Sequence, residues 1–335
     1  MSNLPLLAIT RAVPVRGLPI GSPPAAPLGE RGTPLARVVM APALPAMTRE
    51  QLLAFIRGAG VVVSMFHDKV DAEFLAAAGP QLKGVCNFAV GVDNIDLAAC
   101  RAAGVVATNT PDAVTEGTAN IAWGLLLAVA RRIVEGDRFV RSGRFESEGN
   151  TFPTGWLGMH FTGRTMLIVG AGRIGRAVAL RAQAFGMKVL YTARSRHIDF
   201  EQAPLAAARA DLDEGLSLAD VVSIHTPLTP DTRHLIDAKR LALLRPDAIL
   251  INTARGPVVD EAALADALAA GRLHGAGLDV FEHEPRVHHR LMTLDNVVMT
   301  PHIGSGERFW REEMTRMALD NAAAILAGRP APNAV

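Results

Sequence analysis

The pattern of apolar and polar positions divides the first part of the chain into short apolar runs and longer helical patterns. The runs are rich in β-branched residues, and the helical stretches 49–60 and 71–79 are closed by glycine. Strands that alternate with helices in this way predict an α/β layer. Residues 12–36 are rich in Pro and Gly, which favours a loop. The strands expected in this layer are residues 6–10, 37–42, 60–66, 82–90 and 104–110.

A second series of apolar runs follows a long apolar helical pattern over residues 115–142. Helical patterns separate most of these runs, so we expect a doubly wound parallel sheet of the Rossmann type. A last helical pattern, residues 307–328, follows the final run and could return to pack on the first layer. The strands of this second sheet are expected at residues 165–170, 188–192, 221–226, 248–254, 275–280 and 297–304.

The run at 165–170 ends in the spacing G-x-G-x-x-G, formed by Gly170, Gly172 and Gly175. With 30 glycines in 335 residues, chance alone gives about a quarter of a match per chain, so the context must decide. A strand pattern precedes the glycines and an uninterrupted helical pattern follows, as in dinucleotide-binding turns. There the first glycine permits the tight turn, the second lets backbone approach the pyrophosphate, and the third lets helix and strand pack closely. The alternative is an ordinary strand-to-helix turn.

The end of the next strand departs from the usual dinucleotide site, because the acid expected there is absent. That acid normally accepts a hydrogen bond from the ribose 2′-OH of NAD, about twenty residues past the glycines. No acid occurs between Lys188 and His197, where Arg194, Ser195 and Arg196 stand. Two guanidinium groups can pair with a 2′-phosphate and a serine can donate to it, so we expect a preference for NADP (NADPH). The alternative is that the arginines form a solvated loop and that NAD also binds.

Four residues that can carry chemistry follow three later strands of the predicted sheet. Arg255 follows the run at 248–254, Asp279 and Glu284 lie at and beyond the end of the next run, and His302 lies near the end of the last. Ligands of open α/β sheets bind outside the carboxyl ends of the strands, where these residues converge. A guanidinium can bind a carboxylate and polarise the neighbouring carbonyl, a protonated imidazole can donate a proton, and an adjacent carboxylate favours the imidazolium. The set suits hydride transfer to a 2-keto acid, although each residue taken singly could be a surface charge or a loop residue.

Motifs spread over nearly the whole chain, from about Val61 to Gly328, now resemble a known family, the D-isomer-specific 2-hydroxyacid dehydrogenases. They are NFAVGVDNIDL, NTPDAVTEGTA, GAGRIG, HTPLTPDTRHLI, INTARGPVVDEAAL, GLDVFEHEP and TPHIGS, in that order. Arg255, Glu284 and His302 fall on the catalytic positions of the family. Within it, the chain is most similar to the NADPH-dependent glyoxylate/hydroxypyruvate reductase and 2-ketogluconate reductase branch. The resemblance implies reduction of a small 2-keto acid to the D-2-hydroxy acid, with His302 as the proton donor.

The resemblance also implies binding residues. Asp279 and the backbone near Thr253 would hold the nicotinamide end of the cofactor, and backbone around Val90 and Gly91 would bind the substrate carboxylate together with Arg255 and His302. Met65, Phe66 and His67 stand where the substrate loop of the family should lie, and their bulk leaves the favoured substrate side chain open. The cofactor-binding residues expected in full are Gly170, Gly172, Arg173, Ile174, Gly175, Arg194, Ser195, Arg196, Thr226, Pro227, Thr232, Thr253, Ala254, Arg255, Asp279, His302 and Gly304.

The order of the motifs predicts two domains. The dinucleotide-binding domain would be continuous, residues 113–302. The smaller, flavodoxin-like substrate domain would be discontinuous, residues 1–112 and 303–335. Hinges near Pro111 and Gly304 would let a cleft close and exclude water around the hydride.

The amino-acid composition restricts the classes of partner that the protein could bind. Lys+Arg 34 against Asp+Glu 33 gives a net charge of +1, without the basic field that nucleic acid demands. Cys86 and Cys100 are too few for a disulfide framework. We read no signal peptide in the N-terminal residues, and the longest apolar run, 121–130, is shorter than the ~20 residues of a membrane span. We expect a soluble cytoplasmic protein that acts on small molecules and holds no metal.

The segment 118–140 is apolar on most of its faces and contains Trp123, so we expect it to form a two-fold homodimer interface. The alternative is that it is buried inside one subunit.

Two other functions stay open at this point. Corepressors related to this family keep the fold and the catalytic residues, so the chain could be a nucleotide-sensing interaction protein. A methyltransferase could use the glycine turn, but it would not need Arg255, Glu284 and His302.

Overall fold

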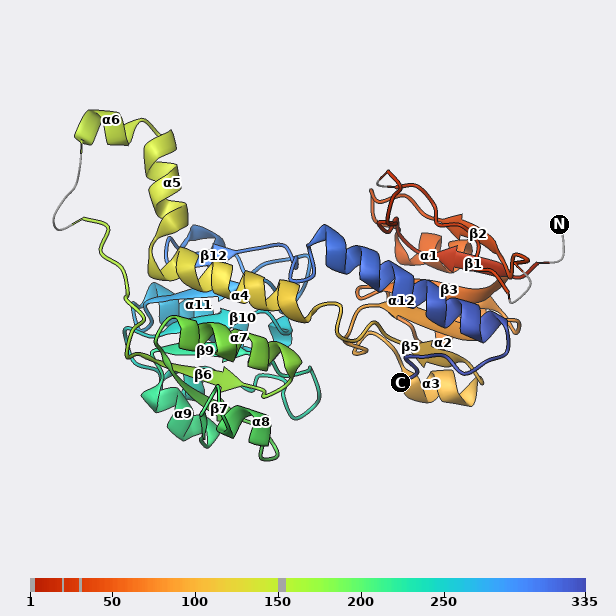
Figure 1. Cartoon of the computed structure of the whole chain (residues 1–335). Coiled ribbons are helices and arrows are strands. Elements are labelled where there is room, and N and C mark those ends of the chain that lie inside the picture. Colours follow the sequence, from red (N-terminus) through yellow and green to blue (C-terminus); the bar gives the residue numbers. More distant parts are fainter. Residues whose placement is uncertain (1–3, 20, 30–31, 150–154) are drawn as a thin grey trace. The chain divides into compact units, whose positions relative to one another are not determined.

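The computed structural model describes residues 4–19, 21–29, 32–149 and 155–335. Its contacts divide the chain into two compact units (Figure 1). Unit 1 comprises Met1–Val114 and Ser305–Val335, and unit 2 comprises Thr115–Gly304. Both junctions lie two residues beyond the boundaries expected from the motifs. The N-terminal residues in which no signal peptide was read include 1–3, which lie outside the described part.

Unit 1 is a five-stranded parallel sheet in the order β2-β1-β3-β4-β5, which is the flavodoxin-like strand order. All five expected strands form, and they are β1 (Leu6–Ile9), β2 (Arg37–Met40), β3 (Ala59–Met65), β4 (Gly84–Phe88) and β5 (Val106–Thr108). The helices of the unit are α1 (Arg49–Phe55), α2 (Ala72–Ala78), α3 (Leu97–Ala102) and α12 (Arg308–Leu326).

The local sequence explains where these helices begin and end. Thr48 and Gln51 form a capping box at the start of α1, and Asp71 caps α2. The expectation that α1 runs to residue 60 was wrong. The helix stops at Phe55, because Gly58 adopts a φ of +78° and the chain enters β3 at Ala59.

Helix α12 returns to the first layer, as the sequence suggested, and lies along the strands of unit 1 (Figure 1). A Cβ at Gly84 on β4 would stand 2.5 Å from Ile325 Cδ1, so the missing side chain lets the helix approach the sheet. The described part of the proline-rich segment 12–36 contains no helix or strand beyond the isolated bridge between Leu28 and Pro34. Thr315 of α12 donates to the Pro14 carbonyl at 2.6 Å, which ties this loop to the helix.

Unit 2 is a seven-stranded parallel sheet in the order β12-β11-β10-β9-β6-β7-β8, so the doubly wound prediction is confirmed. The strands are β6 (Thr165–Val169), β7 (Lys188–Thr192), β8 (Ala208–Arg209), β9 (Val221–Ile224), β10 (Ile249–Asn252), β11 (Gly275–Leu278) and β12 (Val297–Met299). The helices are α4 (Thr115–Ala130), α5 (Ile133–Arg141), α6 (Arg144–Glu148), α7 (Arg173–Ala184), α8 (Ile198–Glu201), α9 (Leu212–Leu218), α10 (Ala238–Leu241) and α11 (Glu261–Ala269), with 3₁₀ turns η1 (Gly256–Val258) and η2 (Leu291–Thr293).

Strand β6 explains how this sheet is buried on both faces. Met166 and Ile168 belong to the apolar core that includes α4 and α7. Leu167 and Val169, on the opposite face, belong to the core that includes α9, α10 and α11. Alternate residues of this apolar strand therefore pack into two different hydrophobic cores, as expected for a parallel sheet between two layers of helices.

The single helix expected over residues 115–142 was wrong, because the structure breaks it between α4 and α5. Arg132 adopts a left-handed conformation with a φ of +53° at the break. Trp123 of α4 is 5% exposed, donates from Nε1 to the Val178 carbonyl and stacks on Phe185 with centroids 4.5 Å apart. The apolar character of α4 is therefore accounted for inside one chain, whereas α5 and α6 project from the sheet of this unit (Figure 1). Within the described residues, no helix has the length and apolar character needed to cross a membrane.

Candidate active site

The glycine turn joins β6 to α7, and its three glycines meet different demands. Gly170 has a φ of +105°, and a Cβ there would lie 2.7 Å from the His225 carbonyl oxygen. A Cβ at Gly175 would lie 2.3 Å from the Gly170 carbonyl oxygen, so this glycine lets the helix pack against the strand. A Cβ at Gly172 would meet no atom within 4 Å. Gly172 thus opens space beside the N-terminus of α7, where Arg173 and Ile174 begin the helix.

The residues after β9 and β10 fit a polar ligand. Thr226 Oγ1 and Thr253 Oγ1 are buried and have no hydrogen-bond partner among the described residues. A buried hydroxyl without a partner is unfavourable unless a ligand or water completes it. Thr232 Oγ1 donates to the Pro227 carbonyl at 2.7 Å and closes the turn that follows β9. The His225 ring is uncharged at neutral pH, because burial lowers its pKa to about 3. Two strand ends on the same sheet as the glycine turn therefore carry hydroxyl groups that a polar ligand can satisfy.

An acid that the local sequence pattern did not reveal, Glu201, contacts the loop after β7. Arg194, Ser195 and Arg196 are exposed, and Arg196 Nε donates to Glu201 Oε2 at 2.6 Å. Tyr191 donates to the other oxygen of Glu201 at 2.7 Å. The hydrogen bond from Tyr191 and then that from Arg196 lower the pKa of Glu201. Glu201 lies at the end of α8, beyond the stretch from Lys188 to His197 in which an acid was sought, and the fold brings it back to that stretch.

A histidine–carboxylate pair stands beyond the carboxyl ends of β11 and β12. His302 Nδ1 and Glu284 Oε2 are 2.9 Å apart, and Glu284 Oε1 accepts from the Phe281 N–H at 3.0 Å. Burial is the largest influence on the pKa of Glu284 and raises it. The hydrogen bond and charge of His302, the Phe281 N–H and the charge of Arg255 outweigh burial, so the pKa of Glu284 lies below its ordinary value. Glu284 is therefore ionised at neutral pH beside the imidazole.

Hydrogen bonds between side chains and backbone hold the turn that carries Arg255. Asn252, at the end of β10, donates to the Arg255 carbonyl at 3.0 Å and accepts from the Ala254 N–H at 3.1 Å. Arg255 Nη1 donates to the Ala254 carbonyl at 2.8 Å. This arrangement fixes the backbone of the arginine close to the carboxyl end of its strand.

Asp279 fixes the turn that carries His302. It is 1% exposed and accepts from Thr300 Oγ1 at 2.6 Å, from the Ile303 N–H at 2.8 Å and from the Gly304 N–H at 2.7 Å. Burial raises the pKa of Asp279 in spite of these hydrogen bonds. The backbone of His302 has a φ of +53°, which is uncommon for a residue other than glycine. The three hydrogen bonds to Asp279 help to hold this conformation. The side-chain hydrogen bonds of Asp279 in the described structure are thus with the histidine turn, a role that the sequence did not suggest.

In unit 1, the loop after β4 carries Val90 and Gly91. Asn109 Nδ2 donates to the Val90 carbonyl at 2.8 Å, and Asn87 Nδ2 donates to the Gly91 carbonyl at 2.9 Å. Among the described residues, the N–H groups of Val90 and Gly91 have no acceptor. Two asparagines therefore hold the carbonyl groups of a loop whose N–H groups can bind an anion.

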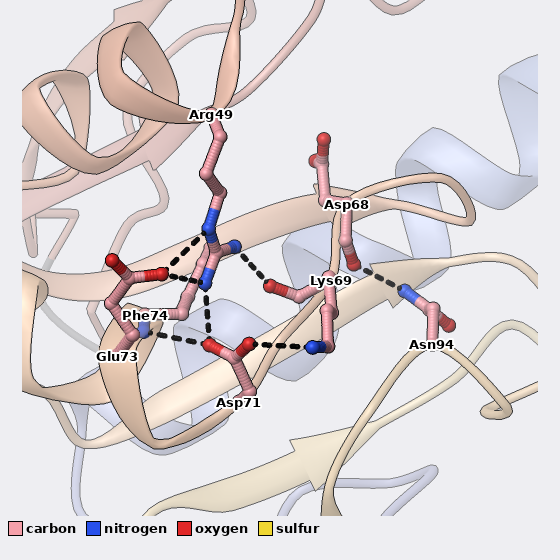
Figure 2. Close-up of polar contacts among 7 residues, drawn as sticks. All are labelled: Arg49, Asp68, Lys69, Asp71, Glu73, Phe74 and Asn94. Carbon is pink, nitrogen blue, oxygen red and sulfur yellow. Dashed lines mark hydrogen bonds and ion pairs between the residues drawn. The ribbon is translucent and has the colours of Figure 1, made fainter.

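The loop after β3, with Phe66 and His67, is also fixed within unit 1. Asn94 Nδ2 donates to the Asp68 carbonyl at 2.9 Å (Figure 2). Asp68 Oδ2 accepts from the Met65 N–H at 2.8 Å. Arg49 reaches the far end of the loop, where it donates to the Lys69 carbonyl and pairs with Asp71 and Glu73. The Phe66 and His67 rings, 5.1 Å apart and edge to face, are therefore presented on a braced turn.

The fold and the glycine turn define a nucleotide-binding protein of the doubly wound α/β class. The model of the D-isomer specific 2-hydroxyacid dehydrogenase NAD binding domain matches residues 123–304. The chain belongs to the family of D-isomer-specific 2-hydroxyacid dehydrogenases, in the glyoxylate/hydroxypyruvate reductase branch. It is a 2-hydroxyacid dehydrogenase that binds NAD or NADP. In the described part of the chain, no group of three or more His, Cys, Asp or Glu side chains could hold a metal ion.

Individual relatives agree with this assignment. The glyoxylate reductase of Thermococcus onnurineus is 48% identical over 290 residues, which are 86% of each chain. A crystal structure of a protein from Thermus thermophilus has a TM-score of 0.86 at 42% identity and covers 98% of this chain and 99% of its own. The NADPH-dependent glyoxylate/hydroxypyruvate reductase from Sinorhizobium meliloti, in complex with NADP and malonate, has a TM-score of 0.80 at 32% identity, with 99% and 96% covered. These relatives favour the enzyme over the interaction protein considered above.

Proposed function

We propose that the protein reduces a small 2-keto acid of the glyoxylate, hydroxypyruvate or 2-ketogluconate type to the D-2-hydroxy acid, with NADPH as the reductant. The observation that carries the proposal is the 2.9 Å contact between His302 Nδ1 and Glu284 Oε2, on the same sheet as the glycine turn and Arg255. The pair supplies a proton, and a guanidinium suits a carboxylate that is adjacent to a carbonyl. The names of the relatives support this substrate class.

The cofactor, when bound, supplies a hydride for the keto carbon. The protein supplies the proton and the orientation. Glu284 engages Nδ1 of His302, so Nε2 is the ring nitrogen that donates the proton to the carbonyl oxygen as it becomes a hydroxyl. Arg255 binds the substrate carboxylate and polarises the carbonyl, which favours arrival of the hydride at carbon. In unit 1, the N–H groups of Val90 and Gly91 bind a carboxylate.

NADPH is favoured over NADH because of the loop after β7. Arg194, Ser195 and Arg196 provide charge-assisted donors for a 2′-phosphate. The bond from Arg196 to Glu201 restrains the guanidinium before the phosphate arrives, so less rotamer freedom is lost on binding. Glu201 also supplies negative charge next to the arginines, which leaves room for NADH as a second cofactor. The NADP complex of the Sinorhizobium relative supports the same preference.

Replacing both Arg194 and Arg196 with alanine should raise the KM for NADPH about tenfold or more for each arginine removed, with a much smaller effect on NADH. A hydrogen bond to a charged group contributes ~1.5–3 kcal/mol, which corresponds to this loss. Steady-state kinetics with both cofactors measure it. Arg240→Ala, which removes another ion-paired arginine of unit 2, is the control and should change neither KM. Equal effects on the two cofactors would mean that the arginines do not read the 2′-phosphate.

The direct assay follows the absorbance of NADPH and of NADH with a panel of 2-keto acids. We expect oxidation of NADPH with glyoxylate and hydroxypyruvate, at a higher kcat/KM than for NADH. The panel also ranks 2-ketogluconate against the smaller substrates. If the protein oxidised neither cofactor with any member of the panel, the proposed function would be wrong. A nucleotide-binding interaction protein would then be the favoured alternative.

We also propose a homodimer formed through α5 and α6. Ile133, Val140 and Phe145 are 54%, 56% and 46% exposed on these two projecting helices. Ile133→Glu combined with Val140→Glu should therefore convert a dimer into a monomer, because the substitutions place charges in an apolar interface. Light scattering measures the mass. Met292→Glu, at a residue of unit 2 that is 68% exposed, should leave the dimer intact, and a wild-type monomer at micromolar concentration would contradict the proposal.

A further inference from the structure

Glu261, the first residue of α11, has a carboxylate for which the mechanism above gives no use. The residue is 8% exposed. Its Oε2 accepts from the Glu282 N–H at 2.6 Å, and its Oε1 accepts from the His288 N–H at 2.7 Å. These two peptide groups lie on either side of Glu284 in the sequence. One buried carboxylate therefore fastens both ends of the segment 282–288 that carries Glu284.

The start of this segment has further attachments. The Glu282 carboxylate accepts from His234 Nε2 at 2.7 Å and pairs with Arg233 at 3.1 Å. A Cβ at Gly256 would stand 1.9 Å from the carbonyl carbon of Phe281, so the turn after Arg255 and the start of the Glu284 segment touch through their backbones. Glu261, however, is the residue that contacts both ends of the segment.

We infer that Glu261 is a positioning residue that holds Glu284 at hydrogen-bond distance from His302. The inference rests on the proposed roles of His302 and Glu284. An ionised carboxylate accepts two N–H groups at once through charge-assisted bonds. A glutamine in its place keeps one acceptor oxygen and turns an NH₂ donor toward the second N–H group. One end of the segment then loses its attachment, and the Glu284 carboxylate moves away from the imidazole.

The experiment compares pH profiles of kcat for ketone reduction in Glu261→Gln, Glu284→Gln and the double variant. Reduction needs the imidazolium, so activity falls on the alkaline side. Losing the Glu284 charge should move this alkaline limb to lower pH, because the neighbouring negative charge is gone. Glu261→Gln should move the alkaline limb in the same direction, by less than Glu284→Gln does, and should lower kcat about tenfold with the KM for NADPH unchanged. In the double variant, Glu261→Gln should add no further shift.

Asp260→Ala is the matched control. Asp260 caps the same helix by accepting from the Ala263 N–H at 2.9 Å, and its described contacts do not include the Glu284 segment. It should lower thermal stability without moving the alkaline limb. Glu261→Asp keeps the charge, and the shorter side chain can reach only one of the two N–H groups. It should fold even where the glutamine variant fails and should shift the limb in the same direction by a smaller amount.

The outcomes separate the inference from the proposed function. An unchanged limb in Glu284→Gln would overturn the roles proposed for His302 and Glu284, and the inference with them. A shift in Glu284→Gln without a shift in either Glu261 variant would overturn the inference alone. An equal shift in Asp260→Ala would also overturn it, because general loosening of α11 would then explain the effect.

Discussion

Replacing His302 with alanine is expected to lower kcat for 2-keto acid reduction by about 10²–10⁴, the usual contribution of a general acid. The expectation follows from the contact with Glu284, which holds the ring through its Nδ1 atom. Since the pKa of Glu284 is lowered below its ordinary value, this carboxylate stays ionised over the neutral range and does not itself cause the alkaline loss of activity. The wild-type rate should fall as the pH rises, while alcohol oxidation should prefer higher pH.

The measurement combines kcat as a function of pH with titration of NADPH binding. In His302→Ala the alkaline limb should disappear, and NADPH affinity should be largely kept because the glycine turn is intact. His289→Ala, which removes an exposed histidine of the same unit, should behave as the wild type. Near wild-type reduction of glyoxylate by His302→Ala, with an unchanged pH profile, would remove His302 from the mechanism.

Arg255→Ala is the second large effect that we expect, with kcat/KM for the keto acid lower by about 10²–10³. In the proposed mechanism, the guanidinium makes charge-assisted bonds to the carboxylate and the carbonyl of the substrate, each worth ~1.5–3 kcal/mol. Because one side chain both anchors the substrate and polarises the carbonyl, KM should rise and kcat should fall together. Steady-state kinetics with glyoxylate and NADPH measure the two constants separately.

Arg255→Lys distinguishes charge from geometry at the same position. A lysine keeps the charge but lacks the planar fork that binds a carboxylate through two parallel bonds. It should recover only part of the activity, mainly through KM. If Arg255→Ala raised the KM for NADPH and left the kinetics of the keto acid unchanged, Arg255 would belong to the cofactor site alone.

The features predictable from the sequence are those that depend on strand order and local spacing. The strands β9 to β12 are apolar runs with clear ends, and parallel pairing brings their carboxyl ends to one edge of the sheet. For this reason His302 and Glu284, which lie 18 residues apart, could be expected at the same edge before their contact was known. The glycine turn could also be predicted from the sequence. Backbone atoms leave no space for a Cβ at Gly170 or Gly175, so glycine is required at both positions and its spacing marks the turn.

The features that could not be predicted depend on contacts between side chains distant in sequence or on local breaks. Glu201 reaches Arg196 only because α8 folds back beside β7. The left-handed Arg132 interrupts a pattern in which no proline marks the end of a helix. Strand β8 is two exposed residues without an apolar run. Glu261 looks like an ordinary acid of a first helical turn until the fold places two peptide N–H groups against it.

The central claim is that the protein transfers hydride from a nicotinamide to the keto carbon of a 2-keto acid. The most direct test is reduction of hydroxypyruvate with NADPH that carries two deuterium atoms at C4 of the nicotinamide, followed by mass spectrometry and chiral analysis of the glycerate. The proposal predicts D-glycerate with deuterium on C2 and an unlabelled hydroxyl group. Glycerate without deuterium on C2, or with the L configuration, would contradict it.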